Sequence, residues 1–484
     1  MNFKISELEG AITEVLNSIG MPGMAVSVTS GNESIYKKVF GYRDVANKIP
    51  ADENTVYAIA SLTKAMTAVC CGMLVDEGKL SWDEPIISYL PEFRMHDDYA
   101  GRNVCLRDML AHNTGLPRHD WVWYNTELSR STEDLVHRIR YLPLNKPMRT
   151  LYEYNNLMYA TAGLVIERVT GQTWAEFIKE RLFKPLGMDN SSPVIKGLSE
   201  AENRALPYNK NSKYPEEAHT TTNYLDFDGM GACGTVNSTI NDMTKWVQLN
   251  LNKGMFGGVQ IVSEKTMKTI HTPVAVQRAF SPIPEIPMLS YALGWGVRTY
   301  RGNLNITHSG GIDGFSTYIS MLPDKNVGIA ILTNLSQGNY MHFVAANMIK
   351  DFMLGSETKD WIKYFKDMND SGEEETKKAN KSILEASTQV SPPDFKSLVG
   401  EYTHKGYGTA YVSLEENLQV KFNGLSRKLS HSNHDTFYFD MSDGANEDLR
   451  ITQFKRNPLG KVTGVLIDAE KALNGEFILF EKPV

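Results

Sequence analysis

Cysteine, basic charge and long apolar runs are all scarce in this chain of 484 residues. Four cysteines are too few for a disulfide scaffold, and all four are expected to be buried apolar residues. The eleven histidines include no His-Glu-x-x-His pattern and no Cys/His cluster, so neither a metal nor an organic cofactor is expected. His431 and His434 are expected to lie in a polar surface turn.

The charge balance and the missing apolar runs exclude further classes of protein. A net charge of −7 and a pI near 5.9 argue against a nucleic-acid partner, because such proteins usually carry a basic domain. No apolar run reaches the ~18–20 residues that cross a bilayer, and the first ten residues lack the apolar core of a secretory signal. We therefore expect no membrane partner and a cytoplasmic location.

The order of strand-like and helical segments predicts an α+β catalytic domain. Helical patterns dominate from residue 61 to about residue 251, between two groups of strand-like runs at 25–60 and 292–333. We expect both groups to share one antiparallel sheet, flanked by helices and interrupted by a helical insert. The first group includes a strand at 56–60, and a helix is expected at 342–353.

The C-terminal part has a different pattern. Residues 367–391 are polar and highly charged and are interpreted as a solvated, partly helical linker. Seven short strand-like runs with Asn, Gly and Asp turns follow, which predicts a small antiparallel β-barrel. The expected domains are therefore 1–366, a linker at 367–391, and a barrel at 392–484.

The segment Ser61-Leu-Thr-Lys64 carries the first chemical signal. On a helix, residues three apart lie on one face, so an amine at 64 can reach a hydroxyl at 61. A serine hydroxyl is a weak nucleophile until a neighbouring base takes its proton. The same spacing occurs at 34–37, in a strand-like run, and at 356–359, past a helix end, but only Ser61 opens a long amphipathic run. The alternative is a helix N-cap beside a solvated lysine.

Tyr154 and Asn156, which precede a helical run, form the second signal. A phenol there could shuttle protons, and an amide could orient a lysine or a substrate carbonyl. The alternative is a helix N-cap, Asn155 or Asn156, beside packed tyrosines.

The third signal is His308-Ser309-Gly310-Gly311, which is expected to follow a short strand at 305–307. Glycines let a substrate approach the backbone closely, and a backbone N–H here could complete an oxyanion hole with that of Ser61. The alternative is a hairpin-type turn with an incidental histidine.

The segment Gly229-Met-Gly-Ala-Cys-Gly234 matches a dinucleotide-binding pattern but is preceded by a loop-like sequence. Such a site requires a preceding strand within a βαβ unit. A nucleotide-binding role is therefore not expected.

In this order, Ser-x-x-Lys, Tyr-x-Asn and His-Ser-Gly resemble the motifs of the serine β-lactamase and penicillin-binding-protein superfamily. The resemblance covers about residues 5–355 and includes Leu106-Arg-Asp-Met-Leu-Ala-His-Asn-Thr-Gly-Leu-Pro117. Within the superfamily, the sequence looks most like the class C-related branch, which also includes D-aminopeptidases and esterases. The C-terminal part resembles a lipocalin-like barrel through Leu398-Val-Gly-Glu-Tyr402 and its strand pattern.

The resemblance implies a role for each motif residue. Ser61 would be the acylated nucleophile, Lys64 its base or proton relay, and Tyr154 the group that protonates the leaving group. Asn156 would contact Lys64 and the substrate. The N–H groups of Ser61 and Gly311 would form the oxyanion hole. Ser309 and Gly310 would belong to the same substrate-binding strand, and His112, in the loop motif, would be structural.

His308 stands where β-lactamases and carboxypeptidases usually carry a lysine that helps to bind a substrate carboxylate. A histidine is largely neutral at pH 7, which weakens the case for a β-lactam or a C-terminal carboxylate as the ligand. The first expectation is therefore a peptidase or aminopeptidase acting on D-amino-acid-containing peptides. A carboxylesterase or lactonase, a β-lactamase or acyltransferase, and a catalytically silent protein that binds β-lactams or muropeptides remain as alternatives.

The expected partner is a small-molecule or short-peptide substrate, and a homo-oligomer is left open. The barrel has two interpretations: a passive stabilising or oligomerising module, or one that lends a loop to the mouth of the active site.

Overall fold

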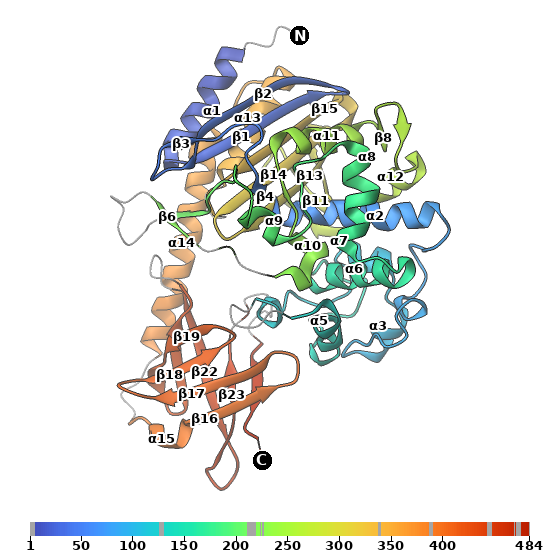
Figure 1. Ribbon diagram of the computed structural model, residues 1–484. Helices are drawn as coiled ribbons and strands as arrows, with labels where there is room; N and C mark the ends of the chain where they lie inside the picture. Colours follow the sequence, from blue (N-terminus) through green and yellow to red (C-terminus); the bar gives the residue numbers. More distant parts are fainter. Residues whose placement is uncertain are drawn as a thin grey trace.

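In the computed structural model, a large β-sheet unit and a C-terminal β-barrel are joined by one long helix (Figure 1). The structure describes residues 5–124, 130–210, 219–222, 224, 227–336, 340–386, 391–442, 448–468, 470 and 476–483.

The main sheet has nine strands in the order β10-β11-β12-β13-β14-β15-β1-β2-β3. β1 pairs antiparallel with β15, with Val26 opposite Ile331, so the early and late strands meet in one sheet as predicted. β14 and β15 are buried along their whole length because helices cover both faces. The strands of this sheet are β1 (Gly23–Ser30), β2 (Glu33–Asp44), β3 (Ile49–Pro50), β10 (Ala275–Arg278), β11 (Leu289–Tyr291), β12 (Gly296–Tyr300), β13 (Asn303–Ile312), β14 (Phe315–Leu322) and β15 (Val327–Thr333).

The strand expected at 56–60 does not join the main sheet. Only β4 (Tyr57–Ala58) forms, and it pairs with β7 (Asn237–Ser238). A left-handed backbone at Ala60, with φ of 48°, turns the chain away from an extended course. The other short strands are β5 (Tyr208–Lys210), β6 (His219–Thr221), β8 (Met255–Phe256) and β9 (Val259–Gln260).

Helices pack on the sheet and build the insert. α11 contacts β1 and β15, while α13 contacts β14, β15 and α1. α2 was expected to be amphipathic, but it is buried on all sides from Thr63 to Leu74, since α6, α10 and α12 also pack against it. The helices are α1 (Ile5–Ile19), α2 (Thr63–Asp76), α3 (Asp98–Asn103), α4 (Leu106–Leu110), α5 (Thr132–Arg138), α6 (Leu157–Thr170), α7 (Trp174–Ile178), α8 (Lys184–Leu186), α9 (Ile195–Ser199), α10 (Gly231–Gly234), α11 (Ile240–Leu251), α12 (Glu264–Ile270), α13 (Met341–Leu354), α14 (Trp361–Glu385) and α15 (Phe395–Leu398).

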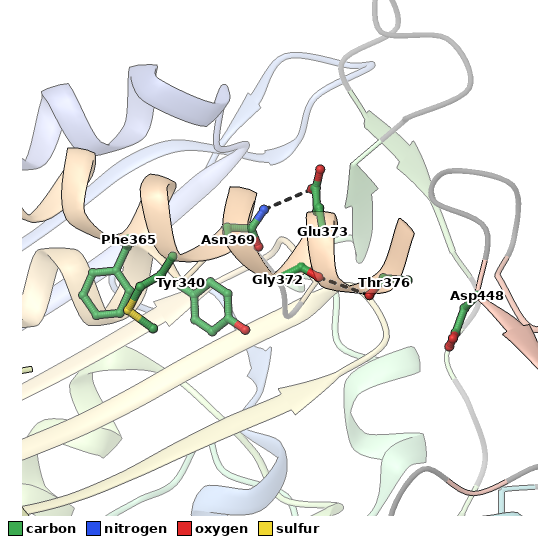
Figure 2. Close-up of a pocket in the computed structure, with 8 residues that line it drawn as sticks. Tyr340, Phe365, Asn369, Gly372, Glu373, Thr376 and Asp448 are labelled. Carbon is green, nitrogen blue, oxygen red and sulfur yellow. Dashed lines mark hydrogen bonds between the residues drawn. The ribbon is translucent and has the colours of Figure 1, made fainter. Parts of the chain in front are cut away.

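α14 runs from the sheet unit to the barrel and fills most of the segment interpreted as a linker (Figure 1). Trp361 anchors its start: the ring is fully buried and its N–H donates to Asp351 at 2.8 Å. Residues 387–390 of that segment lie outside the described residues. A cavity of about 340 Å³ lies between α14 and Asp448 of the barrel, and Figure 2 shows the Tyr340 and Phe365 rings side by side in its lining.

The C-terminal unit is a nearly closed antiparallel barrel in the order β19-β18-β17-β16-β24-β23-β22-β21-β20. It has two strands, β19 and β20, that were not predicted. Their sequences are polar and so lack the apolar pattern by which the other strands were recognised. His431 therefore lies on β20, not in a turn, while His434 occupies the following turn with φ of 49°. The strands are β16 (Gly400–His404), β17 (Gly408–Leu414), β18 (Leu418–Phe422), β19 (Leu425–Lys428), β20 (Ser430–Asn433), β21 (Thr436–Asp440), β22 (Leu449–Arg456), β23 (Val462–Ile467) and β24 (Ile478–Glu481).

All four cysteines are buried, as expected, and none of them forms a disulfide bond. Within the described ranges, none of the helices combines the length and the apolar character that a bilayer crossing requires.

Candidate active site

Ser61 lies in a 3₁₀ turn, Ala60–Leu62, that leads directly into α2. The sequence predicts a helix start at Ser61, and the structure places the first α-helical residue at Thr63. The Ser61 hydroxyl does not cap α2, because neither this turn nor the helix has a side-chain cap. The left-handed backbone at Ala60 introduces local strain next to this serine.

The Ser61 hydroxyl lies between an amine and a phenol. Lys64 Nζ is 3.0 Å from Ser61 Oγ, and the Tyr154 hydroxyl donates to the same Oγ at 2.9 Å. Lys64 is fully buried, with its Nζ 4.9 Å from the centre of the Tyr154 ring. Lys64 therefore lies inside the site and is not a solvated surface side chain.

The Gly229–Gly234 segment also belongs to this site. It forms a 3₁₀ turn and the short helix α10, and the Cys233 carbonyl accepts a hydrogen bond from Lys64 Nζ at 2.8 Å. Neighbouring Ala232 O accepts from Thr67 of α2 at 2.7 Å. Gly231 packs closely against the Trp174 ring and Gly229 against the Arg130 carbonyl, so these glycines permit close packing within the protein.

Asn155 and Asn156 have separate tasks. The Asn155 side chain accepts from the Met158 N–H at 2.9 Å and so caps α6. Asn156 Nδ2 donates to Asp120 Oδ1 at 3.0 Å. The resemblance implied a contact between Asn156 and Lys64. The hydrogen bonds of Lys64 within the described part of the chain instead go to Ser61 and Cys233.

His112 is a buried support for Tyr154. Its ring packs 4.2 Å from the Tyr154 ring, and its Nδ1 accepts from the Asn155 N–H at 3.1 Å. Burial, together with the charge of Lys64, lowers the pKa of His112 well below its ordinary value. A neutral ring that holds the Tyr154–Asn155 backbone in place is a structural role, as the sequence suggested.

His308 to Gly311 lie inside β13 and do not follow it, so the hairpin-turn alternative is wrong. β12 pairs with β13 only as far as Thr307. From His308 onward, β13 is therefore paired with β14 on one edge, and no strand among the described residues pairs with its other edge. Ser309 and Gly311 line the same cavity as Ser61. An extended substrate backbone could hydrogen-bond to such an edge.

The His308 ring is neutral and fixed. Burial lowers the pKa of His308 to about 3, and the positive charges of Lys64 and Arg298 act in the same direction. The hydrogen bond to the Ser309 carbonyl raises the pKa, but by less. Nδ1 lies 2.7 Å from the Ser309 carbonyl, which can only accept, so Nδ1 carries the proton. Nε2 then accepts from the Tyr291 hydroxyl at 2.7 Å. His308 thus shapes the site without adding positive charge.

The cavity around Ser61 measures about 330 Å³ and contains two cations that the sequence analysis missed, Arg118 and Arg298. The lining residues that the structure describes include neither an aspartate nor a glutamate. Burial raises the pKa of Tyr152 and Tyr291 well above the ordinary value, so both phenols are neutral. The site therefore presents guanidinium groups, phenols and hydroxyls to a ligand. The lining comprises Ser61, Arg118, Tyr152, Tyr154, Gln277, Tyr291, Gly296, Arg298, Thr307, His308, Ser309 and Gly311.

Comparison with known families identifies the domain that holds this site. The Beta-lactamase family model matches residues 8–350. The chain belongs to the beta-lactamase family. Residues 385–482 match a second model, Domain of unknown function (DUF3471), which includes the barrel.

Several known proteins are similar to this chain in sequence or in structure. An unguisins hydrolase (ungD') of Aspergillus campestris is 28% identical over 424 residues, which cover 83% of this chain and 76% of that protein. The octameric penicillin-binding protein homologue from Pyrococcus abyssi aligns over 99% of this chain and 100% of its own, with a TM-score of 0.65 and 20% identity. D-amino acid amidase from Ochrobactrum anthropi SV3 aligns over 72% of this chain and 98% of its own, with a TM-score of 0.60 and 22% identity.

Proposed function

We propose that this chain is a serine hydrolase that cleaves amide bonds in short peptides containing D-amino acids, through an acyl-enzyme on Ser61. The observation that carries the proposal is the pair of contacts on one hydroxyl: Lys64 Nζ at 3.0 Å and the Tyr154 hydroxyl at 2.9 Å from Ser61 Oγ. A nucleophile within reach of two proton carriers is the arrangement that acyl transfer requires.

In the acylation step, Ser61 Oγ attacks the substrate carbonyl carbon while its proton passes to the Lys64–Tyr154 pair. The backbone N–H groups of Ser61 and Gly311 stabilise the oxyanion of the tetrahedral intermediate. The Tyr154 hydroxyl then donates a proton to the leaving nitrogen, and the C–N bond breaks. In deacylation, the same pair takes a proton from the attacking water, and Ser61 Oγ regains one as it leaves.

The charge of the cavity narrows the substrate class. Arg298 favours a substrate that carries a carboxylate near the scissile bond, whereas Arg118, which also lines the cavity, is already paired with Asp120. Among the described lining residues no carboxylate is present to receive a free α-ammonium group. The expectation drawn from His308 alone is therefore revised. Arg298 supplies a positive charge that His308 does not, so we favour recognition of a substrate carboxylate over aminopeptidase activity.

The preference for D-amino acids rests on the relatives. One solved structure with this fold is a D-amino acid amidase, and one curated relative is named as a hydrolase of unguisins. We extend the D-amino-acid substrate class to this chain. A homo-oligomer also stays a prediction, motivated by the octameric Pyrococcus homologue and testable by light scattering.

The test is steady-state hydrolysis of N-acetyl-D-Ala-D-Ala, its C-terminal amide, D-Ala-p-nitroanilide and p-nitrophenyl butyrate. We expect the free carboxylate peptide to have the highest kcat/KM, and Ser61→Ala to abolish its cleavage. Turnover of the butyrate ester alone would instead make the protein an esterase. Failure of all substrates to acylate Ser61 would indicate a silent binding protein.

A further inference from the structure

A short segment, Arg118–Trp121, lies between the barrel and the active site. Its residues contact both sides through hydrogen bonds. It joins Pro117, the last residue of the loop motif, to the 3₁₀ turn Asp120–Val122.

On the barrel side, three side chains hydrogen-bond to this segment. The His119 ring Nδ1 lies 2.6 Å from the Tyr407 hydroxyl, and Glu470 Oε1 accepts from the Trp121 N–H at 2.8 Å. Asn423 Nδ2 donates to the Trp121 carbonyl. The Trp121 ring also packs against Phe422, with ring centres 6.0 Å apart.

On the catalytic side, the same segment supplies two contacts. The Arg118 guanidinium lines the cavity with Ser61 and lies 5.2 Å from the centre of the Tyr154 ring. Asp120 Oδ1 accepts from Asn156 Nδ2 at 3.0 Å. The segment therefore orients one cation of the site and the amide of the Tyr-x-Asn motif.

The backbone between these contacts is in a conformation that needs support. His119 has φ of 47°, in the left-handed region that residues other than glycine seldom occupy. Its side chain is fully buried, with Nε2 3.0 Å from the Pro143 carbonyl. Such strained residues persist where the surroundings fix them, and Tyr407 of the barrel is part of those surroundings.

We propose that the barrel is a positioning element for the active site, and that Tyr407 and Glu470 hold the Arg118–Trp121 segment so that Arg118 faces the cavity and Asp120 fixes the Asn156 amide beside Tyr154. The role in turnover rests on the proposed hydrolase function, whereas the structural coupling does not. Neither residue touches the cavity, so each acts through the segment. The barrel thus contributes to substrate binding and is more than a stabilising module.

Glu470 has the protonation state that this role needs. Burial, together with the charge of Asp120, raises its pKa to about 8, and Arg118 and Arg450 act in the opposite direction. The raised pKa favours the neutral carboxyl, and its Oε1 accepts from the Trp121 backbone N–H. A glutamine can replace this neutral acceptor, whereas an alanine cannot.

The test compares full-length Glu470→Ala, Tyr407→Phe and Glu470→Gln with the wild type at pH 7. Asp435→Ala is the matched control, because it removes the Arg456–Asp435 pair within the barrel, away from the segment. Hydrogen exchange of peptides spanning 116–124 and 152–158 reports on the coupling between the barrel and the segment. KM for N-acetyl-D-Ala-D-Ala reports on whether this coupling affects substrate binding.

We expect Glu470→Ala and Tyr407→Phe to speed exchange in both peptides about tenfold and to raise KM more than they lower kcat. Glu470→Gln should rescue both readouts to within twofold, and Asp435→Ala should leave exchange at 116–124 unchanged. Wild-type exchange in both peptides of folded Glu470→Ala and Tyr407→Phe would overturn the proposal. If the exchange changes appear but the wild type cleaves no peptide, the coupling stands and the proposed substrate fails.

Discussion

The Ile59 carbonyl oxygen occupies the space that a side chain at Gly310 would need. A Cβ atom on Gly310 would approach this oxygen, and also Thr317 Oγ1, closer than 3.0 Å. The Thr317 hydroxyl donates to the same carbonyl at 3.0 Å. β13 and β14 therefore lie directly against the turn that carries Ser61, and Gly310 permits this approach.

We expect Gly310→Ala to lower kcat/KM at least ~100-fold, because it separates the Gly311 N–H from Ser61 by displacing β13 or the turn. Gly10→Ala is the matched control. It lies on α1 with nothing within 4 Å of an added Cβ, so activity should be unchanged and stability should rise by up to ~1 kcal/mol. Wild-type kcat/KM in Gly310→Ala would show that the close packing of β13 is irrelevant to the site.

Lys64→Met should lower kcat by ~100- to 10,000-fold, the range expected for loss of a proton-transfer group. Methionine fills similar space at this buried position beside Tyr154 and Cys233 but cannot accept a proton. Single-turnover kinetics would locate the loss in acylation. A kcat within threefold of the wild type, in a protein with an unchanged melting temperature, contradicts the assigned role of Lys64.

Arg298→Met should raise KM for a substrate with a free carboxylate by ~10- to 100-fold, since a charge-assisted hydrogen bond contributes about 1.5–3 kcal/mol. The C-terminal amide of the same peptide provides the control and should change less than threefold. Equal effects on both substrates would mean that Arg298 supports the strand through Thr307 and does not bind the carboxylate.

His342→Phe should stabilise the protein, and more so in acid. His342 is 1% exposed and packs 4.2 Å from the Phe343 ring, and within the described residues neither ring nitrogen has a hydrogen-bond partner. Burial lowers its pKa to about 3, so the unfolded state binds a proton more readily than the folded state. Stability is then lost as pH falls below the unfolded value of about 6.5.

Linkage predicts that this loss reaches ~2 kcal/mol at pH 5 relative to pH 8. Urea unfolding at both pH values should show the gain from His342→Phe to be larger by that amount at pH 5. Gains of equal size at the two pH values would mean that His342 does not titrate as burial requires.

The sequence predicted the parts of the fold that depend on local patterns. The spacing of Ser61 and Lys64 predicted their contact, because side chains three apart meet on any helical turn. Strand patterns of apolar residues predicted that both ends of the first domain share one sheet. The polar strands β19 and β20 were missed, since their pairing comes from the closing barrel and not from their own composition.

Long-range partners could not be predicted. Arg118 and Arg298 come from a loop and a strand that 180 residues separate, and neither belongs to a motif. The length of β13 was underestimated because His-Ser-Gly-Gly reads as a turn, although pairing with β14 keeps it extended. Asn156 was predicted to contact Lys64. Its amide instead donates to Asp120, a residue outside every motif.

The central claim is that Ser61 is the nucleophile, and covalent labelling tests it most directly. The folded protein is incubated with a fluorescent fluorophosphonate, digested, and mapped by mass spectrometry, with Ser61→Ala alongside. We expect a single adduct on the peptide containing Ser61, slower labelling in Lys64→Met and none in Ser61→Ala. An unlabelled Ser61 in the folded wild type, or equal labelling of Ser61→Ala, would contradict the account.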